Sequence, residues 1–554
     1  MKKISLLSIL FVAGIFSACY DDLGNYGYHE INEIEVDSIR NSYNCDTDDS
    51  LCIYPIIKGT EYSDTSRFSY EWEIGSEKVA TTHDLNIIIN MLPGYKFARY
   101  IVKDKETKVK KYYTFNVNVS SSTAGDLLMI LSKYQGQAEL SYLRLDKEAN
   151  WAVNYYQERF NEALGTNPQQ LSICYTQMSK PYPFVTNYGR IMVLADDQIR
   201  LIDKRTLMPD TITPYLTSEA YTGLASYPKP DISTYTPQFI EEVISGWRVQ
   251  TLYNTTYYNN YIMEISNGRL YSAVLGSFGN RYSYDRKTVY DNGSLSPFGY
   301  WDDMSNSESY GTNKLLSYRA GDFILFDQIN HRFLYGDAYG GLYKIGEEDV
   351  KAFPAYDKLL WGSATNSANN TSLAVLSNGT NCQLVLLQAG KDSKGNDTKK
   401  LVGDIAAGSV VNAQTKFYML HYNENLFFVT GNKLYRYNIL NINAGIAPGE
   451  KDVVLKLSDY GYDAEAMITS LCVSRSEKTL LLGVSRYGTD SEGAGEEAKG
   501  DILWFDLNAT TLQVTYRENK STKGVSGIPV EVKIKYQTHW RDGKNLKDEL
   551  VDNI

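Results

Sequence analysis

The sequence predicts an all-β protein in which an immunoglobulin-like β-sandwich precedes a β-propeller-like domain. Three observations support this prediction. Tyr is abundant, with 46 residues against 18 Phe, and aromatic side chains favour half-buried pleated surfaces. Short apolar runs alternate along the chain with turns rich in Gly, Asn and Asp. The pattern also lacks the strand–helix–strand alternation that a parallel sheet requires.

The first 18 residues have the layout of a lipoprotein signal peptide. Lys2 and Lys3 precede an apolar run from Leu6 to Phe16, which is shorter than the ~20 residues needed to cross a bilayer. Two small residues, Ser and Ala, then precede Cys19. This arrangement resembles a bacterial lipobox, in which the Cys thiol receives a diacylglycerol and becomes the new N-terminus. Phe16 departs from the pattern, which usually has Leu there, and an ordinary cleaved signal is the alternative.

Residues 19–30 are expected to form a lipid-anchored tether, because they are polar and contain Gly24 and Gly27. Asp21 and Asp22 resemble the acidic export signal with which Bacteroidota send lipoproteins to the outer face of the outer membrane. Two or three acyl chains would anchor the protein durably, at about 0.8 kcal/mol for each buried CH₂ group. We therefore expect a lipid-anchored outer-membrane protein that faces the cell exterior.

The charge of the chain excludes one class of partner. Removing residues 1–18 deletes two Lys and no acid, so the net charge of −11 becomes about −13. Nucleic-acid binding needs clustered Lys and Arg against the phosphate backbone, and a negative surface is also repelled by anionic lipid headgroups. Neither nucleic acid nor electrostatic docking on a membrane is expected.

Residues 31–120 are expected to form the sandwich. From Phe68 to Ile74, large apolar residues alternate with polar ones, which is the period-two pattern of a half-buried strand. A second strand is expected from Tyr95 to Val102. The strand after it places four apolar residues on one face, namely Tyr113, Phe115, Val117 and Val119. Strands of this length joined by charged turns indicate an immunoglobulin-like module, which we interpret as a spacer.

Ser120 to Thr123 is a polar hinge and the expected domain boundary. Residues 124–543 then repeat short hairpins whose tight turns use Asn, Asp and Gly. A long antiparallel series that must protect its edges closes radially, as a β-propeller. About 420 residues at roughly 45–60 per blade give seven or eight divergent blades. A pair of β-sandwiches is the alternative, and residues 544–554 form a charged C-terminal tail.

Two stretches interrupt the hairpins. Thr236 to Trp247 has apolar residues at helical spacing behind a Pro, which predicts an amphipathic helix packed on the propeller. Thr251 to Tyr310 is loaded with Tyr, Asn, Ser and Gly. Exposed aromatic rings stack on sugars or grip peptide side chains, although they also serve to pack an insertion. The candidate ligand-binding residues are Tyr257, Tyr258, Tyr282, Tyr284, Tyr300 and Trp301.

Five Cys remain after Cys19. Cys45 and Cys52 flank a polar loop and are candidates for a disulfide in an oxidising compartment. Their spacing alone does not decide whether they pair. The other three, Cys174, Cys382 and Cys472, occur in apolar strand-like runs and are expected in the core.

No catalytic or cofactor motif emerges from the sequence. The five His form no close metal-binding pair, and neither a Gly-x-Ser-x-Gly elbow nor a phosphate-binding loop occurs. Glycoside hydrolysis needs two carboxylates about 5–9.5 Å apart, for which Asp302 and Asp303 are the best-placed candidates. Adjacent acids in a loop are more often simply solvated. We expect no metal, no cofactor and no catalytic residue.

The N-terminal third resembles the PKD-like lipoproteins of Bacteroidota. The resemblance rests on Asp21 to Tyr26, Ile31 to Ile34, Tyr70 to Ile74, Tyr100 to Asp104 and Gly125 to Leu131. Such proteins are similar to accessory lipoproteins beside starch-utilisation-type transporters of the outer membrane. The resemblance implies capture or handling of a glycan or peptide at the cell surface, and it supplies no catalytic residue.

The sequence therefore favours a non-enzymatic surface lipoprotein that captures or presents a glycan or peptide for nutrient uptake. The expected partners are a TonB-dependent transporter and its substrate-binding lipoprotein. Two alternatives stay open. One is a surface glycan hydrolase or lyase on a propeller. The other is a purely structural subunit of the transporter complex.

Overall fold

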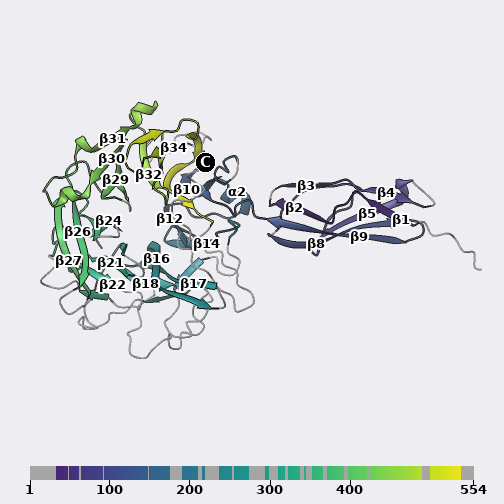
Figure 1. The fold of residues 1–554 in the computed structure, drawn as a ribbon, viewed down its shortest axis with the longest axis horizontal. Coiled ribbons are helices and arrows are strands. Elements are labelled where there is room, and N and C mark those ends of the chain that lie inside the picture. Colours follow the sequence, from purple (N-terminus) through teal and green to yellow (C-terminus); the bar gives the residue numbers. More distant parts are fainter. Residues whose placement is uncertain are drawn as a thin grey trace, which may run out of the picture. The chain divides into compact units, whose positions relative to one another are not determined.

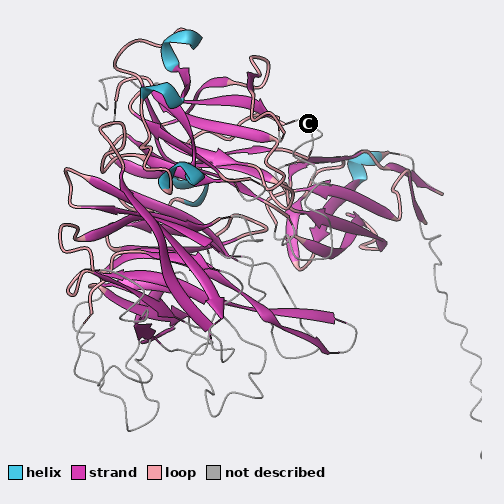
Figure 2. Cartoon of the chain, turned by 60° about the vertical axis from the view of Figure 1, so that its left-hand side comes forward, coloured by secondary structure: helices cyan, strands magenta, loops and turns pink. Residues whose placement is uncertain are grey.

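The chain divides into two units, Met1–Ser122 and Thr123–Ile554. The computed structural model describes residues 33–537 with internal gaps (Figure 1). Strands make up nearly all of the regular structure, and the few helical turns are short (Figure 2). The gaps are residues 48, 61–63, 92, 147–148, 175–189, 210–214, 219–235, 253–254, 274–293, 298–309, 319–321, 337–341, 345–351, 366–370, 392–396, 421–422, 489–498 and 509.

The first unit is the expected immunoglobulin-like β-sandwich. Its larger sheet has the strand order β2-β9-β8-β5-β6, and two smaller sheets pair β1 with β4 and β3 with β7. The strands are β1 (Ile34–Asp37), β2 (Ser42–Asp46), β3 (Ser50–Ile53), β4 (Ile56–Gly59), β5 (Phe68–Ile74), β6 (Glu77–Ala80), β7 (Leu85–Ile88), β8 (Gly94–Asp104) and β9 (Lys110–Ser120), with a 3₁₀ turn η1 (Thr65–Arg67) before β5.

Aromatic residues fill the core of the sandwich. Trp72 is fully buried, and its ring stacks on Tyr100 with 4.0 Å between centroids. The indole Nε1 of Trp72 donates a hydrogen bond to the Thr82 carbonyl at 2.9 Å, so the polar atom of the ring is satisfied. The alternation predicted for the last strand is confirmed, because Phe115, Val117 and Val119 all point into this core.

The cysteines of the sandwich are both free thiols, so the candidate disulfide between Cys45 and Cys52 is not formed. Cys45 lies in β2 and packs partly against the core. Cys52 lies in β3 on the exposed side of a different sheet, where its Sγ donates to Asn86 Oδ1 at 3.3 Å. The polar loop joins β2 directly to β3, so the two strands are neighbours in the sequence. However, the strands join separate sheets, and only one of the two thiols faces inward.

The second unit is a β-propeller. Its described strands form seven blades in chain order around a central axis (Figure 1). Blades two and three share one eight-stranded sheet, because their outer strands β15 and β19 pair in parallel. From the inner to the outer strand, these two blades contain β12 (Pro168–Cys174), β13 (Arg190–Ala195), β14 (Gln198–Asp203) and β15 (Tyr215–Ser218), then β16 (Pro237–Leu252), β17 (Thr255–Ser266), β18 (Arg269–Ala273) and β19 (Ser294–Pro297).

The next four blades follow the same plan, with 3₁₀ turns η2 (Ile439–Ile442), η3 (Glu450–Asp452) and η4 (Leu457–Tyr460) at their edges. Their strands are β20 (Leu315–Tyr318), β21 (Asp322–Asp327), β22 (Arg332–Gly336) and β23 (Leu342–Lys344); β24 (Lys358–Ala364), β25 (Thr371–Ser377), β26 (Cys382–Lys391) and β27 (Asp397–Ala406); β28 (Lys416–Met419), β29 (Asn425–Thr430), β30 (Lys433–Asn438) and β31 (Val453–Lys456); and β32 (Met467–Val473), β33 (Thr479–Ser485), β34 (Gly500–Leu507), β35 (Val514–Tyr516) and β36 (Thr522–Ser526).

The first blade closes the ring. It joins β10 (Leu127–Tyr134) and β11 (Gln137–Arg144) to β37 (Ile528–Lys535), so strands from both ends of the unit share one sheet. A short helix, α2 (Tyr156–Phe160), packs against β11. Gly527 is required just before β37, because a Cβ atom there would lie 2.1 Å from the Lys133 carbonyl oxygen. This closure joins the two ends of the second unit in one blade.

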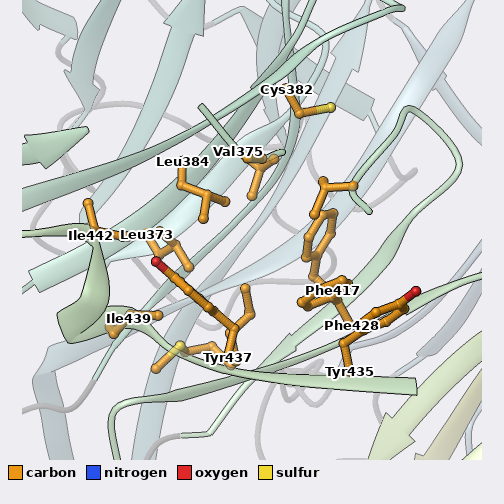
Figure 3. Packing of buried hydrophobic residues seen from close by; sticks show 14 of the residues in the cluster. Leu373, Val375, Cys382, Leu384, Phe417, Phe428, Tyr435, Tyr437, Ile439 and Ile442 are labelled. Carbon is orange, nitrogen blue, oxygen red and sulfur yellow. The ribbon is translucent and has the colours of Figure 1, made fainter. Parts of the chain in front are cut away.

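Apolar clusters between neighbouring blades hold the propeller together. In the cluster between blades five and six, Val375 and Leu384 face Phe428 and Tyr437 (Figure 3). The rings of Phe428 and Tyr435 stack with 4.7 Å between centroids. Because each blade packs on the next through such a cluster, the positions of the inner strands are fixed around the axis.

The helix predicted from Thr236 to Trp247 is wrong, since this stretch is part of β16. β16 pairs with β17 over its length, and the register shifts between Pro237 and Phe239 and between Ile244 and Val249. Each irregularity breaks the strict alternation of a strand. The apolar residues consequently fall at spacings that resemble those of a helix.

Candidate functional site

The inner strands of the seven blades surround a cavity of about 590 Å³. Every inner strand contributes to its lining: β12, β16, β20, β24, β28, β32 and the closing strand β37. The volume lies within the range of pockets that hold small ligands. We call this cavity the central channel.

Five charged residues line the central channel. Glu241 lies on β16, Lys314 directly before β20, and Lys416 at the start of β28. Glu531 and Lys533 lie on β37, where Val532 and Ile534 alternate with them. Val532 and Ile534 pack into the apolar cluster of the first blade, so the period of two places the two charged residues on the channel side.

Glu531 and Lys533 form an ion pair that also ties two blades together. Lys533 Nζ lies 3.1 Å from Glu531 Oε1, and the backbone N–H of Leu171 on β12 donates to Glu531 Oε2 at 2.5 Å. The Lys533 side chain keeps 36% of its surface accessible to the channel. Burial acts to lower the pKa of Lys533, but the charges of Glu531 and Glu241 outweigh it and raise that pKa.

Glu241 and Lys314 are pushed toward their neutral forms. Burial raises the pKa of Glu241 to about 7, with the charge of Glu531 adding to the rise and Lys533 and Lys314 opposing it. Burial and then the charge of Lys416 lower the pKa of Lys314 to about 8. The pKa values of both groups therefore lie within about one unit of neutral pH, and the charge of a bound ion would shift these pKa values.

Side chains clamp the inner strands to one another around the channel. Gln170 on β12 bonds to both backbone groups of Ile240 on β16, at 2.7 and 3.0 Å. Asn313 makes the same two-way contact with Leu359 on β24, at 2.8 and 3.1 Å. Ser470 Oγ accepts from the Val532 N–H at 2.8 Å. These bonds hold the channel wall in place before any ligand enters, which lowers the cost of binding.

Two of the six aromatic residues proposed from the sequence lie on a described strand. Tyr257 and Tyr258 lie on β17, the second strand of blade three, with backbone partners Gln250 and Val249 on β16. The other four candidates, Tyr282, Tyr284, Tyr300 and Trp301, lie outside the described residues, as do Asp302 and Asp303. Cys19, Asp21 and Asp22 also lie outside them.

One pattern in the sequence indicates the channel wall, although it was not used to predict the site. The pattern Glu-Val-Lys in residues 531–533 puts two opposite charges on one face of an otherwise apolar strand. A charged face on a strand buried in a propeller marks the inner wall. Cys472, expected in the core, also lines the channel, whereas Cys174 and Cys382 are buried as expected.

The described residues contain neither a candidate metal site nor a candidate membrane-spanning helix. Among them, no group of three or more His, Cys, Asp or Glu side chains is placed to hold a metal ion. Within the same residues, no helix has the length and apolar character needed to traverse a bilayer.

Comparison with known proteins bears on the two units differently. The model of the PKD-like family matches residues 19–168, which include the whole sandwich and continue to the start of β12. The sandwich is thus PKD-like, as the resemblance of the N-terminal third implied. No curated protein matches the chain.

Solved structures resemble the chain at low sequence identity. A quinonprotein alcohol dehydrogenase-like protein from Bacteroides thetaiotaomicron is 10% identical, with 89% of this chain and 96% of that chain covered and a TM-score of 0.44. A prolyl endopeptidase is 10% identical over 72% of this chain and 54% of its own, with a TM-score of 0.28. PorZ, a surface component of the type-IX secretion system of Porphyromonas gingivalis, is 10% identical over 77% and 58%, with a TM-score of 0.21. These likenesses are weak, and the propeller is established by its strand pairing.

Proposed function

We propose that this chain is a lipid-anchored, non-enzymatic protein of the outer membrane that binds a small soluble ligand in the central channel. The ligand would be a glycan or peptide unit on its way to a TonB-dependent transporter. The observation that carries the proposal is the channel itself, a cavity of about 590 Å³ that is walled by all seven inner strands and lined with charged and polar side chains among apolar ones. Charged side chains are costly to bury in a wall that has only a structural role.

The proposed location rests on the sequence before the sandwich. The small residues in front of Cys19 and the acidic pair Asp21 and Asp22 support lipidation and export to the outer face. Labelling with radioactive palmitate tests the anchor, and Cys19→Ala is its control. Label in the wild type that is lost in the variant supports the anchor, whereas an unlabelled wild type would remove the surface role.

The binding role is tested with the mature chain from residue 20 and a variant that fills the channel. Ala413 lines the channel and is only half-buried, so Ala413→Trp would occupy part of the cavity. Val402→Trp is the matched control, because Val402 is exposed on the outer strand β27. We expect calorimetry to detect binding from a set of glycan fractions and peptide pools, with loss only in Ala413→Trp. Equal binding by all three proteins would place the ligand elsewhere.

Two alternative functions, an enzyme and a structural subunit, can be distinguished from ligand binding by experiment. A hydrolase or lyase would release products from a surface glycan, and a structural subunit would copurify with a transporter while binding no ligand. We favour binding because the ion pair and the strand clamps make a rigid, polar wall. Product analysis by chromatography after incubation with polysaccharides separates the enzyme from the binding protein.

A further inference from the structure

The central channel has more charged residues than its one ion pair contains. Glu531 and Lys533 satisfy each other at 3.1 Å. Three charged residues of the wall remain outside that pair, namely the carboxyl group of Glu241 and the ammonium groups of Lys314 and Lys416. They come from three different blades, so the unmatched charges are spread around the wall.

A neutral ligand fits such a wall poorly. A ligand that fills the cavity displaces water from each charged group, and an ion that loses its water without a partner costs several kcal/mol. A neutral sugar supplies hydroxyl groups but no compensating charge. A ligand that carries its own charges replaces the lost water with charge-assisted hydrogen bonds.

The two unmatched lysines favour a negatively charged group on the ligand. Lys314 Nζ donates to the Leu360 carbonyl at 3.1 Å, which leaves two of its three donors for other partners. Lys416 lies close enough for its charge to lower the pKa of Lys314. Two ammonium groups that repel each other inside a cavity gain from an anion placed between them, and a carboxylate has the oxygens to accept from both.

Glu241 favours a positively charged group on the same ligand. Its carboxyl group lines the channel on β16, next to the blade that carries Lys314. A ligand ammonium would pair with the ionised carboxylate and offset the burial that disfavours that form. The wall therefore offers one acid for a cation and two lysines for an anion.

We infer that the central channel binds a short peptide with free termini, its ammonium group on Glu241 and its carboxylate on Lys314 and Lys416. This inference rests on the proposed function and narrows its ligand from a glycan or peptide to a zwitterionic peptide. The cavity of about 590 Å³ has room for a few residues at most, since larger chains need more space than a small-ligand pocket provides.

The test compares four probes on the mature chain by calorimetry. These are an equimolar pool of tripeptides with free ends, the same pool acetylated at the N-terminus, the same pool amidated at the C-terminus, and maltotriose. We expect the free pool to bind and each capped pool to bind at least about tenfold more weakly, because each cap removes one charged contact. Maltotriose should not bind.

Two variants assign the contacts. Glu241→Gln should weaken binding of the free pool at least about tenfold and leave binding of the acetylated pool unchanged, since that pool has no ammonium group to lose. Lys416→Gln should likewise weaken binding of the free pool at least about tenfold and leave binding of the amidated pool unchanged, since that pool has no carboxylate to lose. Lys451→Gln, on the exposed turn η3, is the matched control and should change nothing.

The outcomes separate the inference from the function it rests on. If glycan fractions bind and Ala413→Trp abolishes that binding, the channel is a binding site but the peptide inference is wrong. Equal binding of free and capped pools, or no effect of Glu241→Gln on the free pool, also overturns the inference. If no glycan or peptide binds the wild-type chain, the proposed function itself fails.

Discussion

The two units of this protein treat charge in opposite ways. In the described part of the sandwich, the charged residue that is fully buried is Asp104, and Arg67 Nε lies 2.9 Å from its carboxylate. The sandwich shows apolar groups to solvent instead, with Tyr95 69% and Phe97 52% exposed. The propeller buries carboxylates and lysines in several blades, among them Glu139, Asp501 and Lys535.

This difference is the reason for proposing the binding site in the propeller and not in the sandwich. Asp104 accepts from Arg67 and from the N–H groups of Glu106 and Thr107, so its charge is satisfied by residues of the sandwich itself. Burial alone would raise the pKa of Asp104, but these hydrogen bonds lower it to about 2. The channel of the propeller instead has three charged residues, Glu241, Lys314 and Lys416, outside its ion pair. Asp104 is thus satisfied within the sandwich, whereas the channel has charged groups that the proposed ligand would contact.

The largest expected effect comes from breaking the ring at its closing strand. Val532 is buried on β37 opposite Ile130 of β10, and Val532→Asp would place an unpaired carboxylate in the first blade. We expect a loss of about 3–5 kcal/mol, comparable to that for a buried charge without a partner. Urea denaturation should show the loss in the propeller transition alone.

The control for this variant is Val402→Asp, the same substitution at an exposed position on the outer strand β27. It should change stability by less than about 0.5 kcal/mol. If both variants change the free energy of unfolding equally, the closing strand contributes no more to stability than a surface strand, which would contradict its role in closing the ring.

A similar loss is expected in the sandwich when its central ring is removed. Trp72→Ala deletes a fully buried side chain that stacks on Tyr100 and donates to Thr82. Substitutions of this kind cost about 3–5 kcal/mol. Calorimetry should show a lower melting temperature for the sandwich and an unchanged propeller. Tyr112→Ala, at an exposed position on β9, is the control and should leave both transitions in place.

A smaller effect is expected from pH, with opposite signs in the two units. Burial raises the pKa values of Glu139, Asp126 and Asp501 in the propeller. A carboxyl group whose pKa is higher in the folded state binds its proton more tightly there, and the pKa of Glu241 is about 7, so these acids should add stability to the propeller as pH falls from 7.5 to 5.5. Lys535, whose pKa burial lowers to about 7, offsets part of this gain because it takes up its proton in a buried site over the same range. We expect its melting temperature to rise by about 1–3 °C.

The sandwich should respond only at lower pH. The folded pKa of Asp104 is about 2, below its ordinary value, so the stability that it contributes is present above pH 4 and lost as pH falls toward 2. Scanning calorimetry at pH 7.5, 5.5 and 3 tests both signs. A propeller that loses stability between pH 7.5 and 5.5 would contradict the assignment of its buried acids.

The smallest effect is a difference in thiol reactivity within the sandwich. Cys52 is exposed, whereas Cys45 is half-buried and burial, followed by the charges of Asp49 and Asp46, raises the pKa of its thiol. Because the thiolate is the reactive form, maleimide should label Cys52 several-fold faster than Cys45 at pH 7. Mass spectrometry of the labelled peptides measures both rates, and an unreactive pair would indicate a disulfide instead.

Much of the fold was predictable, because period two is a direct consequence of strand geometry. Phe68 to Ile74 and the face carrying Phe115 and Val117 were predicted with their burial. The stretch that contains Glu241 was not, since bulges in β16 change the spacing on which the prediction depends.

The candidate site was less predictable for a different reason. The wall of the channel is assembled from residues that lie far apart in the chain, such as Glu241 and Glu531, which are separated by 290 positions. A single sequence shows which residues are polar, but it does not show which strands become innermost. The aromatic stretch could be proposed as a site because its composition is unusual. The composition around Glu531 and Lys533 is ordinary, and only their position on the inner strand β37 makes them part of the channel wall.

The pairing of β10 with β37 also sets the order of events during biosynthesis. Residues near 130 wait for partners near 530, so a nascent chain cannot finish its first blade until almost all of the polypeptide has been made. The sandwich has all its partners within the first 120 residues and is free to fold much earlier. Premature termination anywhere in the second unit would therefore leave a folded module attached to an aggregation-prone remainder, a product that cellular quality control should degrade.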